Sequence, residues 1–137
     1  MFKNLQDSKG FPSQLLIIFL NGSFMLEKYL TQEKILIEIK VSDWRELIGV
    51  VGNILVQTGD IESRYIDAMI KVIEDLGPYA VIAPGVVLLH ARPEDGVKRV
   101  CIAMATLAQG INFGSVNDPV RLAMLSEQLT MIHILKF

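Results

Sequence analysis

The sequence predicts an α/β (α+β) domain with a single mixed sheet flanked by helices. Two observations favour this class. An alternating strand pattern is followed by two helical patterns, and several short apolar runs come after them. In addition, 51% of the 137 residues are hydrophobic and 20% are charged, a balance typical of one globular domain with a sizeable core.

The regular part of the sequence is expected to begin at Met25, so that residues 25–137 form the domain. Residues 1–24 hold several turn residues and sustain no amphipathic period. Within them, the apolar run 15–20 is far shorter than the roughly 20 residues that span a bilayer. We interpret 1–24 as an N-terminal extension or a strand. A signal peptide is the alternative, because lysines precede the apolar run.

The range 34–41 alternates as a strand does, which places the isoleucines Ile35, Ile37 and Ile39 on one face. The period then changes to that of a helix, whose apolar stripe is Trp44, Leu47, Ile48, Val51, Ile54 and Leu55. Asp43 and Glu46 have the spacing of a capping box, which predicts where this helix begins. The segment 58–60 is expected to end it.

A second helix is expected from about 62 to 76. Its apolar stripe is Tyr65, Ile66, Met69, Ile70, Ile73 and Leu76. Gly77 and Pro78 predict a sharp stop, because glycine suits the backbone past a helix end and proline cannot continue the helix.

The remaining sequence predicts strands joined by turns. The expected strands are 79–83, 86–89, 97–107 and 120–125. The expected turns lie at 84–85, 93–96, 109–110 and 117–119, where glycine, proline, asparagine and aspartate gather. The range 126–137 is interpreted as a short helix.

His90 is the best candidate for chemistry, because it stands where a buried strand leaves the core for a polar turn. A neutral imidazole is a nucleophile near neutral pH. Arg92 follows two residues later and can pair with anionic oxygens. From these residues alone, a hydrogen-bonded structural histidine is the alternative interpretation.

Other classes of function are not expected. The net charge is −2 with no block of lysine and arginine, so nucleic acid is not an expected partner. A single cysteine cannot form an internal disulfide, and with only two histidines beside it neither a metal site nor a cofactor is expected. Cys101 lies inside an apolar strand and is interpreted as a core residue.

The stretch 77–97, around His90, reads GPYAVIAPGVVLLHARPEDGV. It resembles the active-site segment of the mannitol/fructose class of enzyme IIA proteins of the sugar phosphotransferase system, and within that class it is most similar to the ascorbate-type members. The segments 65–69, 112–114 and 117–120 resemble the preceding helix and the later turn and strand of that family.

The resemblance implies a cytoplasmic phosphotransferase that works as a relay. The histidine phosphocarrier protein would donate a phosphoryl group to His90. His90 would pass it to a cysteine of a cognate enzyme IIB, which phosphorylates sugar entering through the membrane enzyme IIC. Arg92 and the backbone N–H groups of 91–96 would support the negative charge of the phosphate. The alternatives are a catalytically impaired or regulatory binding domain of the same fold and an interaction domain that forms a homo-oligomer.

The sequence also departs from the family pattern. Leu89 stands where many relatives have proline, and Val72 stands where mannitol-type members carry arginine. After Leu125 the sequence does not resemble the family's loop with a second histidine and two helices, so a shortened C-terminal end of the fold is expected. His133 does not match the spacing of that second histidine and is interpreted as structural.

Overall fold

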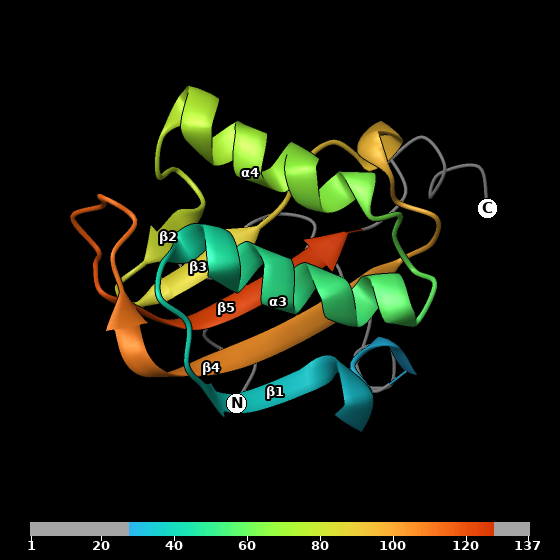
Figure 1. Cartoon of the computed structure of the whole chain (residues 1–137), viewed down its shortest axis with the longest axis horizontal. Coiled ribbons are helices and arrows are strands. Elements are labelled where there is room, and N and C mark those ends of the chain that lie inside the picture. Colours follow the sequence, from blue (N-terminus) through green and yellow to red (C-terminus); the bar gives the residue numbers. More distant parts are fainter. Residues whose placement is uncertain (1–27, 128–137) are drawn as a thin grey trace, which may run out of the picture.

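The computed structural model describes residues 28–127 and shows one mixed sheet of five strands in the order β1-β4-β5-β3-β2 (Figure 1). The strands are β1 (Ile35–Ile39), β2 (Val81–Ala83), β3 (Val86–Leu89), β4 (Cys101–Ile111) and β5 (Val120–Glu127). The helices are α3 (Trp44–Gln57) and α4 (Arg64–Leu76), with 3₁₀ turns η2 (Gln32–Lys34) and η3 (Pro93–Asp95). The predicted fold class is confirmed. The expected extension over 1–24 and His133 lie outside the described residues.

The pairing of the strands gathers several chain segments at one end of the sheet. β3 is parallel to β5, β5 is antiparallel to β4, and β4 is parallel to β1. The last residues of β3 and β5 therefore lie at the same end as the first residues of β4 and β1. We call this end, which β3 leaves just before His90, the His90 end of the sheet.

Side chains that alternate along the strands divide the core between the two faces of the sheet. Val87 and Leu89 of β3 share one face with the buried residues of α3 and α4, so both helices cover that face (Figure 1). Leu88, Ile102 and Met124 form a second cluster that Tyr29 and Leu30 contact. No helix among residues 28–127 is long and apolar enough to cross a membrane.

The two helices begin and end close to the predicted residues. Asp43 caps α3 by accepting a hydrogen bond from the Glu46 N–H at 2.8 Å. The Glu46 carboxylate in turn accepts from the backbone N–H and the hydroxyl of Ser42, and these bonds lower the pKa of Glu46. α4 ends at Leu76 and is followed by Gly77, whose φ is +83°. One stripe residue was wrongly placed, since Leu76 is 62% exposed.

The first strand has a different inner face from the predicted one. Ile37 is 67% exposed, whereas Leu36 and Ile39 pack on the core. The reason is a β-bulge: Glu38 has a φ of +55°, and the register with β4 shifts between Leu36 and Ile39. Because a bulge adds one residue, simple alternation cannot hold across it.

The bounds of β4 also correct the sequence analysis. The range 97–100 is not part of the strand, because the N–H groups of Lys98 and Arg99 donate to the Asp60 carbonyl instead of a neighbouring strand. The range 109–110 is not a turn but continues β4. A Cβ at Gly110 would lie 2.6 Å from the Cβ of Pro119, so glycine permits the close approach of these two segments.

Candidate functional site

His90 directly follows β3, so the sheet fixes the backbone that carries it. Its side chain is half-buried, and its Nδ1 lies 2.9 Å from the carbonyl oxygen of Leu88. A carbonyl oxygen only accepts hydrogen bonds, so Nδ1 must carry the proton in the neutral ring. The lone pair of the imidazole is then on Nε2, which makes Nε2 the nucleophilic atom.

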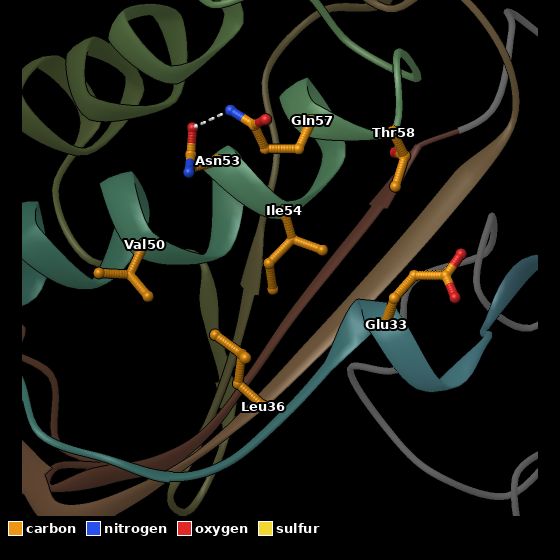
Figure 2. A pocket seen from close by; sticks show the side chains of 7 residues that line it. All are labelled: Glu33, Leu36, Val50, Asn53, Ile54, Gln57 and Thr58. Atoms are coloured by element: carbon orange, nitrogen blue, oxygen red, sulfur yellow. Dashed lines mark hydrogen bonds between the residues drawn. The ribbon is translucent and has the colours of Figure 1, made fainter.

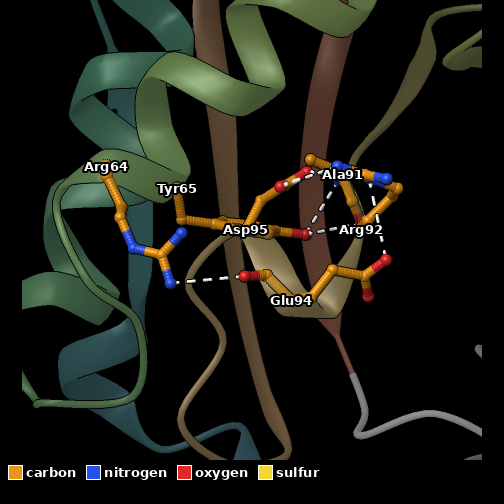
Figure 3. A network of polar contacts seen from close by, with 6 residues as sticks. All are labelled: Arg64, Tyr65, Ala91, Arg92, Glu94 and Asp95. Atoms are coloured by element: carbon orange, nitrogen blue, oxygen red, sulfur yellow. Dashed lines mark hydrogen bonds and ion pairs between the residues drawn. The ribbon is translucent and has the colours of Figure 1, made fainter.

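The residue after His90 is held by Tyr65 from α4. The Tyr65 hydroxyl accepts a hydrogen bond from the Ala91 N–H at 2.8 Å and lies 3.0 Å from the Ala91 carbonyl oxygen (Figure 3). It also hydrogen-bonds the carboxylate of Glu127, the last residue of β5. Tyr65 is fully buried, and burial raises the pKa of its hydroxyl far above the ordinary value. The phenol therefore stays protonated and joins three elements at the His90 end of the sheet.

The turn after Ala91 is closed by its own backbone. The N–H of Asp95 donates to the Arg92 carbonyl, and the N–H of Gly96 donates to the Pro93 carbonyl. The N–H groups of Ala91, Asp95 and Gly96 therefore already donate hydrogen bonds within the protein, although they were among those expected to support a phosphate. Gly96 has a φ of +144°, and a Cβ there would lie 3.0 Å from the Cβ of Tyr65, so glycine lets the turn rest on α4.

Arg92 is the cation in this turn, and its side chain is 73% exposed. Its guanidinium donates to both carboxylate oxygens of Asp95, at 3.2 and 3.3 Å, and lies 3.7 Å from the Glu94 carboxylate (Figure 3). The hydrogen bond from Arg92 holds the pKa of Asp95 below its ordinary value. Exposed ion pairs of this kind exchange readily, so an incoming anion can compete for the guanidinium.

In the part of the chain that the structure describes, a groove lies beside each of the helices α3 and α4. One, of about 440 Å³, adjoins the turn after His90 and is lined by Ala68, Lys71, Val72, Asp75, Leu76, Arg92 and Asp95. The other, of about 450 Å³, runs between α3 and β1 and contains neither His90 nor Arg92. Figure 2 shows Leu36 facing Val50 and Ile54 across it. Of the two grooves, only the first is lined by a candidate residue, Arg92, and His90 lines neither.

Cys101 is a core residue, as predicted. It has no exposed surface, and burial raises the pKa of its thiol to about 12, with the nearby Asp60 and Glu127 charges adding to the rise. A thiol in this environment stays protonated and is a poor nucleophile. Among residues 28–127, no three histidine, cysteine, aspartate or glutamate side chains are grouped so that they could hold a metal ion.

Sequence reasoning proposed His90 and Arg92 as site residues. It counted Tyr65 only as part of an apolar stripe and missed its hydrogen bonds to Ala91 and Glu127. The structure places His90 at the end of β3 and Arg92 in the turn that follows, and the Tyr65 hydroxyl contacts Ala91 between them. The residue type was the one signal in the sequence that could have pointed to these hydrogen bonds of Tyr65. A buried tyrosine, unlike phenylalanine, needs a hydrogen-bond partner for its hydroxyl.

Comparison with known proteins relates this chain and its fold to the sugar phosphotransferase system. Residues 28–126 match the family described as the phosphoenolpyruvate-dependent sugar phosphotransferase system, EIIA 2. The match covers well over half of the sequence, so the chain belongs to this family. The family that the sequence was predicted to resemble is thereby confirmed.

Two relatives are ascorbate-specific PTS system EIIA components. The protein of Salmonella typhi is 38% identical over 85 residues, which are 61% of this chain and 55% of the relative. The protein of Escherichia coli (strain K12) is 36% identical over 89 residues, which are 64% of this chain and 58% of the relative. The chain thus spans little more than half the length of these relatives.

Solved structures confirm the fold. The mannitol-specific cryptic phosphotransferase enzyme IIA CmtB from Escherichia coli has a TM-score of 0.72 and 28% identity, over 81% of this chain and 76% of that chain. Enzyme IIA in its complex with phosphorylated enzyme IIB for mannitol, also from Escherichia coli, has a TM-score of 0.65 and 25% identity. That match covers 77% of this chain and 74% of the solved one.

Proposed function

We propose that this protein is a phosphoryl carrier for sugar uptake, with Nε2 of His90 as the acceptor atom. The observation that carries the proposal is the Nδ1–H···O=C contact to Leu88, which leaves the lone pair on Nε2 at the end of a rigid strand. Membership of the EIIA 2 family supports it. The proposal implies a cytoplasmic location.

The proposed transfer has two steps. First, the Nε2 lone pair attacks the phosphorus carried by the histidine phosphocarrier protein, and the donor's P–N bond breaks with its electrons staying on the donor imidazole. The Leu88 carbonyl then stabilises the positive charge of the phosphorylated His90 ring through Nδ1–H. In the second step, a cysteine thiolate of a cognate enzyme IIB attacks the phosphorus and the P–Nε2 bond breaks, which restores neutral His90.

Arg92 is proposed to support the transferred phosphate. In the structure it pairs with Asp95 and Glu94, so it must turn from these carboxylates toward the phosphoryl oxygens. The further route runs from enzyme IIB to sugar entering through a membrane enzyme IIC. The names of the relatives favour an ascorbate-type substrate for the system.

The test is transfer of labelled phosphate from phosphoenolpyruvate through enzyme I and the histidine phosphocarrier protein. We expect acid-labile label on the wild-type protein and none on His90→Ala. His133→Ala is the matched control, because it removes the other histidine of the sequence, and it should keep the label.

A folded wild-type protein that takes up no label would contradict the carrier role. That result would favour the alternative of a catalytically impaired or regulatory binding domain with the same fold. Val72 stands where mannitol-type members carry arginine, so the support of that arginine is absent here. Label that persists in His90→Ala and disappears in His133→Ala would show that His133 is the acceptor and that His90 is not.

A further inference from the structure

Tyr65 holds the peptide groups next to His90 from inside the core. We infer that Tyr65 is a positioning residue for His90, acting through the backbone of Ala91 to fix the imidazole for phosphoryl transfer. The inference rests on the proposed function, since it concerns how the same histidine is held. It goes beyond that function by assigning a role to a buried hydroxyl in α4.

The Tyr65 hydroxyl is itself fixed by its surroundings. The Tyr65 side chain belongs to α4 and is fully buried, and the turn at Gly96 packs against it. The hydroxyl has one proton with two acceptors in reach, the Ala91 carbonyl and the Glu127 carboxylate, while it accepts from the Ala91 N–H. A phenol held by packing and by several hydrogen bonds has little freedom to move.

His90 is thereby held from both sides along the chain. On one side, Leu88 and Leu89 are fixed in β3, which pairs with β5, and the Leu88 carbonyl accepts from the imidazole. On the other side, the Ala91 N–H donates to the Tyr65 hydroxyl, and the Ala91 carbonyl is one of the two acceptors in reach of the hydroxyl proton. If Ala91 were released, the backbone of His90 could rotate and the contact to Leu88 would weaken.

The expected gain is in the alignment of the reacting atoms. In-line transfer requires Nε2, phosphorus and the donor nitrogen to be nearly collinear, and a displacement of about 1 Å can slow a reaction by on the order of a hundredfold. A core residue with no positioning role would be replaced by phenylalanine with little effect on the imidazole. Tyr65→Phe separates these cases, because it removes only the hydroxyl.

The experiment compares Tyr65→Phe with Tyr79→Phe, an equal change at a side chain that is 83% exposed. Two quantities are measured: the rate of phosphoryl transfer from the histidine phosphocarrier protein, and the ¹⁵N signals of the His90 ring, which report the tautomer. We expect Tyr65→Phe to slow transfer by about tenfold or more and to shift the ring from the Nδ1–H form toward a mixture. Tyr79→Phe should match the wild type in both.

The two readouts separate failure of the inference from failure of the proposed function. A folded Tyr65→Phe with wild-type rate and tautomer would overturn the positioning role. A wild-type protein without transfer would overturn the carrier role, and the ring signals would still test the positioning. If Tyr65→Phe does not fold, hydrogen exchange of the wild type decides: a protected Ala91 amide supports the inference, and one that exchanges like an open loop amide overturns it.

Discussion

Asp60 is a buried carboxylate that joins three segments at the His90 end of the sheet. Its oxygens lie 2.9 Å from Lys34 Nζ and 2.6 Å from Arg99 Nε, and they accept from the Thr58 hydroxyl at 2.8 Å. Lys34 immediately precedes β1, and Arg99 belongs to the segment that leads from the candidate site into β4. One side chain thus holds the start of two strands against the loop between α3 and α4.

We predict that Asp60→Asn lowers the free energy of unfolding at neutral pH by about 3 kcal/mol, because it leaves the buried Lys34 ammonium without its counter-charge. Urea unfolding measures this. Asp75→Asn is the matched control: it breaks the exposed pair with Lys71 and should cost less than about 0.5 kcal/mol. Equal losses in the two variants would contradict the role assigned to Asp60.

The free energies of unfolding of the wild type and Asp60→Asn should differ less in acid. Burial alone would raise the pKa of Asp60, but the hydrogen bonds from Lys34, Thr58 and Arg99 outweigh it and lower the pKa below the ordinary value of 3.8. A carboxyl with a lowered pKa stabilises the fold fully above its unfolded-state pKa and loses that effect as the pH falls through the folded-state value. The stability difference between wild type and Asp60→Asn should therefore shrink below about pH 4.

Residue-level reasoning from sequence singled out His90 as a candidate but not Tyr65, which hydrogen-bonds the next residue, Ala91. His90 stands out because a histidine follows an apolar run, and the surrounding segment resembles a known family. Tyr65 contacts Ala91 and Glu127, which are 26 and 62 positions away along the chain. No local pattern can show such contacts, so its role required the fold.

At the scale of elements, the helices were predictable and two strands were not. The capping contacts of α3 involve residues three or four positions apart, and the stop of α4 is a single glycine, so local spacing fixes both. The inner face of β1 and the bounds of β4 depend on distant partners. Thr106 accepts the Glu38 N–H at the bulge, and Asp60 holds the segment before β4.

A pair of glycine substitutions compares the end of α4 with the interior of α3. Gly77 has a φ of +83° and a ψ of −167°, a conformation that residues with a side chain rarely adopt. Gly77→Ala should destabilise the protein by about 1–3 kcal/mol through backbone strain. Gly49 lies inside α3, and Gly49→Ala should stabilise by about 0.5–1 kcal/mol.

Neither change causes a clash, because a Cβ at each position has no atom within 4 Å. Thermal unfolding of the two variants against the wild type would show the shifts. Changes of the same sign in both variants would refute the backbone explanation.

At the scale of the whole molecule, the sequence predicted one mixed sheet but did not predict the order of its strands. Order depends on pairing between distant segments: β1 lies beside β4, and β3 lies beside β5. Periodicity shows which residues form strands but carries no information on their neighbours. The position of His90 relative to Glu127 therefore became visible only in the structure.

The central position of β4 and β5 predicts an uneven pattern of amide hydrogen exchange. These two strands pair with each other, and each has a further strand on its outer side. Their amides should exchange most slowly, near the rate set by global unfolding, whereas β1 and β2 should open more readily. Exchange of β2 amides as slow as that of β5 would contradict this order of local stability.

The bulge in β1 also affects how copies of this protein can associate with one another. Among the described residues β1 and β2 form the two borders of the sheet, and an open border is a template for polymerisation by strand addition. β2 has only three residues, and the left-handed Glu38 interrupts the straight row of backbone groups along β1. If this protein forms the homo-oligomer that its sequence allows, we expect the copies to meet through side-chain surfaces and not to extend one continuous sheet.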